Sequence, residues 1–160
     1  MIVVADASPV HYLVLIGAAE VLEPLYGRVL VPQAVADELQ AANTPEAVRA
    51  WMAHLPPWCE VRPDAPSDPA VRYLDAGEQA AIALALSVNA DRLLIDERAG
   101  RVEAEHRGVL VTGTVCVLAE AHRRALLGFE ASLARLRATN FHVSSDLMDR
   151  VRQRLARTGL

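Results

Sequence analysis

The sequence predicts an α/β fold, a three-layer α/β/α sandwich with a mainly parallel central sheet, from three observations. Short apolar runs rich in Val, Ile and Leu alternate with helix-length segments along the chain. These runs are continuous, as expected for strands buried on both faces. The chain has 160 residues, of which 52% are hydrophobic and only 4% aromatic, so Ala, Val and Leu must fill one core.

The first elements follow from β-branched residues and helix-start signals. Ile2–Ala5 is a short apolar run that predicts a buried strand. Ser8 and Pro9 are suited to an N-cap and a first helical position, which predicts a helix to about Ala19. Arg28–Val31 predicts the second strand.

Two prolines mark the helices that follow. Pro32 starts a predicted helix to about Ala41, and Thr44-Pro45 starts another to about Leu55. Cys59–Arg62 predicts a minor strand, within a stretch, Leu55–Pro69, that holds five of the nine prolines. We interpret that stretch as an internal connection, not as a domain boundary.

The second half of the chain continues the alternation. Asp75 and Glu78 have the spacing of a capping box and open a predicted helix to about Val88. The remaining expected elements are the strands Arg92–Ile95 and Val109–Val111 and the helices Arg98–Arg107, Thr114–Leu126, Glu130–Ala138 and Ser144–Ala156, the last capped by Ser144.

Composition restricts the function classes. Cys59 and Cys116 are isolated, which indicates neither a zinc site nor a disulfide framework. No signal peptide or membrane span is evident, and Val10–Ala19 is too short to cross a bilayer, so we expect a cytoplasmic protein without a membrane partner. The net charge of −4 divides into −9 for residues 1–120 and +5 for residues 121–160. This distribution allows a cation site in the body and a polyanion contact near the C-terminal end.

Four acids occupy positions where apolar residues are expected. Asp6 and Asp96 follow predicted strands, while Glu38 and Glu78 lie on or beside the inward faces of predicted helices. Each has an ordinary structural explanation when taken alone, such as a turn residue or the capping partner of Asp75. Taken together, crowded carboxylates need raised pKa values or a cation, and Mg²⁺ or Mn²⁺ prefers such oxygen ligands.

The ordered segments "VVADASPV", "VLVPQAVADEL", "LDAGEQAAIALAL", "DRLLIDERAGR" and "GVLVTGTVCVLAEA" resemble the PIN-domain nucleases, and within them the VapC-like toxin branch. The resemblance is firm over residues 1–127 of a single PIN-like domain spanning 1–160. It implies an α/β/α sandwich, an acid cluster that binds Mg²⁺ or Mn²⁺, and hydrolysis of RNA. It also implies a toxin held by a cognate antitoxin, and a homodimer.

The family's acid positions match Asp6, Glu38, Glu78 and Asp96, which the resemblance makes the catalytic and metal-binding residues. Ser8 matches a hydroxyl that supports the first acid.

The fourth acid remains open between two neighbours. Asp96 directly ends its predicted strand, but Glu97 follows it and is an alternative ligand. Arg101 offers phosphate-binding charge nearby, and Asp75 is a further supporting residue.

Two other function classes compete with a nuclease. Receiver domains and haloacid-dehalogenase-type phosphatases also collect acids at strand ends, but both use a Lys and this chain has none. A non-catalytic PIN-like module that binds RNA or a partner stays open. Residues 128–160, a helical C-terminal extension, carry Arg-rich segments suited to RNA phosphates or to a docking partner.

Overall fold

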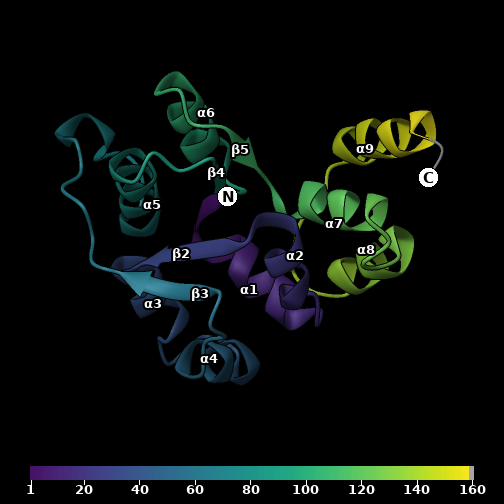
Figure 1. The fold of residues 1–160 in the computed structure, drawn as a ribbon, viewed down its shortest axis with the longest axis horizontal. Helices are drawn as coiled ribbons and strands as arrows, with labels where there is room; N and C mark the ends of the chain where they lie inside the picture. The colour runs from purple at the N-terminus through teal and green to yellow at the C-terminus, as the bar shows by residue number, and fades with distance from the viewer. Residues whose placement is uncertain (159–160) are drawn as a thin grey trace.

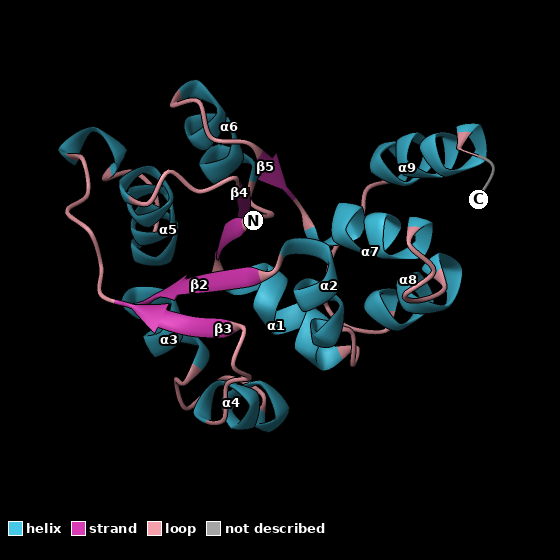
Figure 2. Ribbon diagram, viewed as in Figure 1, coloured by secondary structure: helices cyan, strands magenta, loops and turns pink. Residues whose placement is uncertain are grey.

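A five-stranded parallel sheet forms the centre of the protein in a computed structural model that describes residues 1–158 (Figures 1 and 2). The strands are β1 (Ile2–Ala5), β2 (Arg28–Pro32), β3 (Cys59–Arg62), β4 (Arg92–Leu94) and β5 (Val111–Thr112). Their spatial order is β3-β2-β1-β4-β5, and every neighbouring pair is parallel. The predicted α/β/α fold class is therefore confirmed.

Helices cover both faces of this sheet. They are α1 (Ala7–Leu15), α2 (Leu22–Tyr26), α3 (Gln33–Leu39), α4 (Glu46–Ala53), α5 (Ala76–Ser87), α6 (Arg98–His106), α7 (Thr114–Arg123), α8 (Phe129–Arg137) and α9 (Ser145–Arg157), with short 3₁₀ turns η1 (Ala19–Val21) and η2 (Pro69–Val71). Because side chains alternate across a strand, Val3 and Ala5 join one core with α1, α7 and α8, whereas Val4 joins a second core with α5. One core lies on each face of the sheet, so the layers are helices, sheet and helices (Figure 1).

The strand order places a topological switch point between β1 and β4. The chain runs outward from β1 through β2 to β3, then returns to the other side of β1 as β4. Adjacent connections therefore leave the carboxyl ends of β1 and β4 in opposite directions, which opens a crevice where ligands of such sheets bind. Asp6 and Asp96 follow these two strands.

Most predicted elements are confirmed within a few residues, and two differences at the first helix have physical causes. Asp6, not Ser8, occupies the N-cap of α1, and Pro9 fits the first turn because N–H groups there need no intrahelical partner. The first helix ends at Leu15, where Gly17 has a φ of 72°, a conformation that suits glycine. The short helices η1 and α2 were not expected.

The last strand begins two residues later and ends one residue later than predicted. Val109–Val111 is apolar, but the ladder to β4 forms at Val111–Thr112. Gly108, with a φ of 82°, turns the chain after α6. Val109 and Leu110 then lead back to the sheet, and the strand itself begins at Val111.

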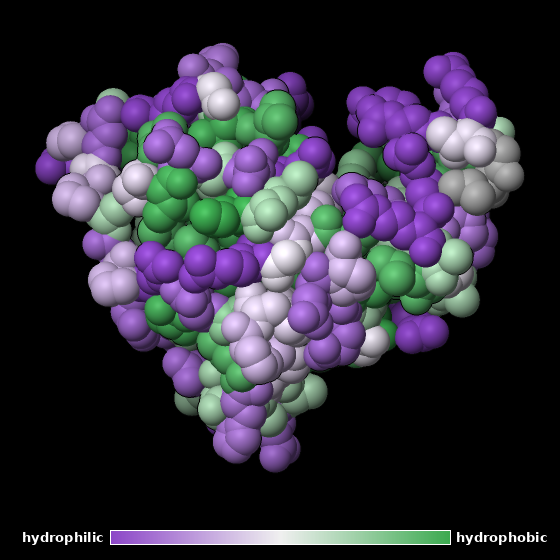
Figure 3. All heavy atoms as spheres, viewed as in Figure 1, coloured by the Kyte–Doolittle hydropathy of each residue, from purple (hydrophilic) through white to green (hydrophobic). Residues whose placement is uncertain are grey.

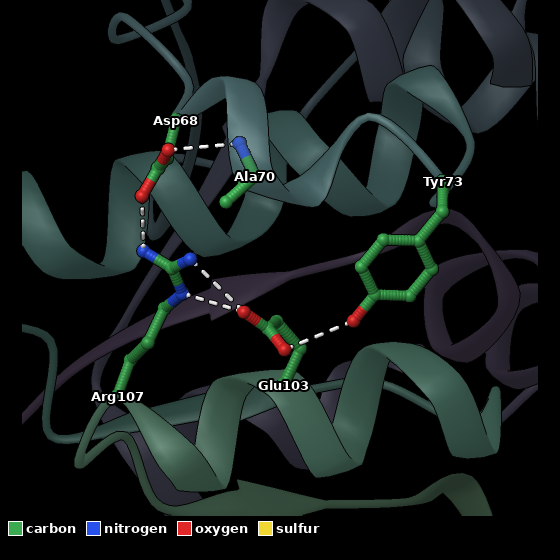
Figure 4. A network of polar contacts seen from close by, with 5 residues as sticks. All are labelled: Asp68, Ala70, Tyr73, Glu103 and Arg107. Atoms are coloured by element: carbon green, nitrogen blue, oxygen red, sulfur yellow. Dashed lines mark hydrogen bonds and ion pairs between the residues drawn. The ribbon is translucent and has the colours of Figure 1, made fainter.

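The proline-rich connection between β3 and α5 is tied to α6 by a polar network (Figure 4). Arg107, just after α6, pairs with Asp68 at 3.0 Å and with Glu103 at 2.9 Å. The Tyr73 hydroxyl donates to Glu103 at 2.9 Å. These contacts hold the segment that leads into α5, and hence the approach to Asp75.

The proposed single-domain boundaries stay a prediction, although α8 and α9 pack into the same core as β1. None of the helices within residues 1–158 combines the length and apolarity that a membrane-spanning helix needs.

Candidate active site

Asp6 is held at the switch point by its own backbone. Its N–H donates to the Leu94 carbonyl at 2.9 Å, which extends the β1–β4 pairing by one residue. Only 5% of Asp6 is exposed. Burial, followed by the charges of Asp75, Glu78 and Glu38, raises the pKa of its carboxyl to about 7, while a hydrogen bond from Ala7 acts in the opposite direction. A carboxylate in this condition favours a nearby cation.

Glu38 approaches from α3, whose Val35 and Leu39 anchor the helix in the core. The residue as a whole is exposed, in agreement with the predicted position at the border of the buried face. Partial burial of the carboxyl group and then the charge of Asp75 raise its pKa. Glu38 therefore lies at the exposed rim, in contrast to buried Asp6.

Glu78 and Asp75 meet at the start of α5 in the predicted capping box. Asp75 Oδ1 accepts from the Glu78 N–H at 2.7 Å, and the Asp75 N–H donates to Glu78 Oε2 at 3.3 Å. Glu78 is 6% exposed. Burial, then the charge of Asp75 and more weakly that of Glu97, raises its pKa. Glu78 therefore caps the helix and also lies among the neighbouring carboxylates.

Gly77 shows how closely these acids converge. A Cβ at this glycine would lie 3.2 Å from Glu38 Oε2, 3.4 Å from Asp6 Oδ1 and 3.5 Å from Asp75 Oδ1. Oxygens from β1, α3 and the start of α5 therefore surround one small volume that only a residue without a side chain leaves open. We call Asp6, Glu38, Asp75 and Glu78 the acid cluster.

Asp96 lies at the same edge of the sheet but has other contacts. Its Oδ2 accepts from the Ser8 hydroxyl at 2.8 Å and from the Thr114 hydroxyl at 2.7 Å, and its Oδ1 accepts from the Thr114 N–H at 2.8 Å. A carboxylate offers about four lone-pair sites, so only one, on Oδ1, is left for another partner. Asp96 ties the starts of α1 and α7 together. Ser8 thus supports Asp96 directly, and Asp6 only through the chain.

Glu97 and Arg101 both line a groove at this edge of the sheet. Glu97 is exposed, yet close enough to Glu78 for its charge to raise the pKa of that residue. Arg101 is half-buried on α6, and its Nε is buried without a hydrogen-bond partner among residues 1–158. The structure therefore brings Glu97 toward the acid cluster, whereas Arg101 has no hydrogen bond or ion pair with it in the part of the chain that the structure describes.

The residues present fit a hard divalent cation. The donors are all carboxylate oxygens, which Mg²⁺ and Mn²⁺ prefer, and the space at Gly77 lies between three of them. Within residues 1–158, no three His, Cys, Asp or Glu side chains already have the mutual arrangement of a finished metal site.

Sequence reasoning undervalued three residues. Asp75 was expected only in support, because the capping box explained it. Gly77 left a signal, since glycine is a poor helix former and yet stands in the first turn of α5. Thr114, fully buried, was missed because its role depends on the pairing of two distant turns.

Comparisons with known proteins identify the family of this chain and support its fold. The DUF3368 family model, described as a PIN domain, matches residues 2–157. No curated protein matches the chain. A solved structure of a PilT N-terminus domain protein, SSO1118 from the hyperthermophilic archaeon Sulfolobus solfataricus P2, superposes with a TM-score of 0.52 at 17% identity. The match covers 90% of this chain and 100% of that one, and it supports a shared fold.

Proposed function

Because the chain belongs to the PIN-domain family, we propose that it is a metal-dependent ribonuclease that hydrolyses RNA phosphodiester bonds. PIN domains are typically nucleases that use divalent metal ions. One observation carries the proposal for this chain: carboxylate oxygens of Asp6, Glu38 and Asp75 surround the open space at Gly77. Such crowding of like charges at a sheet edge is costly without a cation.

The residues of the site have distinct roles in this proposal. Asp6 would be the buried ligand for Mg²⁺ or Mn²⁺, and Glu38 and Glu78 would contribute carboxylates from α3 and α5. When bound, the ion lowers the pKa of water and offsets negative charge on a phosphoryl group. The negative charges of the acid cluster repel a phosphate, so the cluster can position a phosphate only when the cation is present.

The fourth carboxylate comes from the end of β4. We propose Asp96, which uses its remaining lone pair on Oδ1, with Glu97 as the alternative through its proximity to Glu78. Substitution of Glu97 distinguishes these two candidate ligands. Glu97→Gln should leave Mn²⁺ affinity unchanged if Asp96 is the ligand and weaken it if Glu97 is.

The wider role follows from the family resemblance alone. We propose a cytoplasmic toxin, restrained by a cognate antitoxin and acting as a homodimer. A second candidate is a non-catalytic PIN-like module that binds RNA or a partner. In its favour, no finished metal-ligand group stands among residues 1–158.

An RNA-cleavage assay with Mn²⁺ tests the proposal. The substrate is a broad pool of cellular RNA, because a single RNA can miss a selective nuclease. We expect cleavage by the wild-type protein and none by Asp6→Asn or Glu38→Gln. Asp37→Asn is the matched control, since Asp37 neighbours Glu38 on α3 but bonds to Gln33 at 2.8 Å. An intact pool, or full activity in Asp6→Asn, contradicts the proposal.

Growth inhibition on expression gives an independent readout of the toxin role. Wild-type protein should slow growth, whereas Asp6→Asn should relieve that inhibition. If both inhibit growth equally, the toxicity does not come from the acid cluster.

A further inference from the structure

A groove beside the acid cluster separates α6 from α9. It has a volume of about 990 Å³, and its walls include Ser8, Tyr12, Arg98, Arg101, Phe141 and Arg150. Figure 3 shows a notch in the molecular surface between the parts formed by α6 and by α9, which face each other in Figure 1. We call it the α6–α9 groove. Because Ser8, Asp96 and Glu97 line it too, the groove is continuous with the edge of the sheet that carries the acid cluster.

The arginines of the α6–α9 groove are available for a ligand. Within residues 1–158, Arg98, Arg101 and Arg150 have no carboxylate at ion-pair distance. By contrast, Arg107, just after α6, and Arg152, on α9, each form an ion pair. The buried Nε of Arg101 also lacks a hydrogen-bond acceptor. Arg101 and Arg150 both line the groove, so their guanidinium charges, unpaired among the described residues, suit a phosphate ligand.

The positive groups converge from both walls. Burial raises the pKa of the Cys116 thiol, and the charges of Arg154, Arg101 and Arg150 act in the opposite direction. Arg101 comes from α6 and Arg150 from α9, so cations from the two walls act on one thiol in the groove. The carboxylates of the groove are Asp96 and Glu97, at its acid-cluster end, and Glu105 on α6.

An aromatic wall accompanies these charges. The rings of Tyr12 and Phe141 meet edge to face with centroids 4.8 Å apart, and the Tyr12 hydroxyl donates to Asn140 Oδ1 at 2.7 Å. Both residues are half-buried, so part of each ring faces the groove. Fixed aromatic rings beside arginines are the recurrent means of binding single strands, because every base has a face that stacks.

We propose that the α6–α9 groove binds a single-stranded RNA segment next to the acid cluster, with Arg101 and Arg150 on its phosphates and with Tyr12 and Phe141 against its bases. The choice of RNA rests on the proposed function. In this proposal α9, at the C-terminal end of the chain, contributes to substrate binding. A duplex fits less well because its bases are stacked on each other and cannot reach the rings.

Fluorescence anisotropy with a short labelled oligouridylate, in EDTA to prevent cleavage, tests the proposal. Arg101→Ala and Arg150→Ala should each weaken binding roughly tenfold and lower the salt dependence of log affinity by about one. Arg152→Ala is the matched control: Arg152 is exposed on the same helix but pairs with Glu130 at 2.9 Å, and its loss should change binding little. The duplex of the same sequence should bind more weakly. Urea unfolding of each variant checks the fold, and exposed Arg150 provides a variant independent of half-buried Arg101.

The outcomes are separable from those of the nuclease assay. Wild-type cleavage combined with normal binding by the Arg101 and Arg150 variants overturns the groove and leaves the nuclease standing. Weakened binding by those variants, without any cleavage by wild-type protein, supports the groove and overturns the nuclease. Labelled polyglutamate is a probe for an acidic protein segment. If it binds as tightly as RNA and depends on the same arginines, the groove is a protein site and the RNA proposal fails.

Discussion

The crowding of the acid cluster should destabilise the metal-free protein, and Asp6→Asn should relieve this cost. Burial and neighbouring carboxylates raise the pKa of Asp6 from 3.8 to about 7. Between these values the folded protein binds a proton that the unfolded chain does not bind. Stability therefore falls as the pH rises through this window and is lowest above it.

The size of the effect follows from the pKa interval. At about 1.4 kcal/mol per pKa unit, the interval amounts to about 4 kcal/mol above neutral pH. Asn carries no charge, so the unfolding free energy of Asp6→Asn should exceed that of wild type by up to about 4 kcal/mol near pH 8 and by little near pH 4. Mn²⁺ should reverse the order, because it stabilises only a protein that binds it.

Urea denaturation in EDTA measures this difference. Trp51 and Trp58, whose rings lie 6.0 Å apart at the core, provide the fluorescence signal far along the chain from Asp6. Equal unfolding free energies for wild type and Asp6→Asn at every pH would refute the reasoning, since a buried and crowded carboxylate cannot be without cost. A variant less stable than wild type near pH 8 would refute it as well.

Three further predictions follow from the geometry. Gly77→Ala should weaken Mn²⁺ binding in calorimetry with little loss of stability, because its methyl group would occupy the space between the carboxylates; unchanged affinity would place the ion elsewhere. Asp96→Ala should lower the unfolding free energy by about 1–3 kcal/mol, since buried Thr114 loses both acceptors, and Asp96→Asn should cost less; equal effects of Ala and Asn would contradict this. Burial raises the pKa of both thiols, but Cys59 is only 4% exposed whereas half-buried Cys116 lines the α6–α9 groove, so a thiol titration of folded protein should find Cys116 reactive and Cys59 only after unfolding.

Local patterns in the sequence predicted most of the elements around the site. The continuous apolar run at Ile2–Ala5 predicted β1 because a strand buried on both faces has no room for polar residues. The capping box at Asp75 and Glu78 formed as predicted because both of its hydrogen bonds lie within four residues. The helices η1 and α2 were missed, since their turns carry no cap signal.

The candidate site was only partly accessible to such reasoning. Asp6, Glu38 and Glu78 were chosen because a charge stood where an apolar residue was expected, and the structure brings all three together. Asp96 was chosen on the same ground, but the structure binds its oxygens to Ser8 and Thr114. One residue pattern therefore led to two different environments.

The sequence by itself determined most of the strands and helices and the identity of the acids, because these depend on periodicity and on neighbours within a few residues. Only the tertiary structure decided which oxygens meet at Gly77, that Asp96 holds two turns together, and that Arg101 and Arg150 face one groove. Those contacts join residues between 18 positions apart, as in Asp96 and Thr114, and 88 positions apart, as in Ser8 and Asp96. They depend on the order of strands in the sheet, and no local pattern records that order.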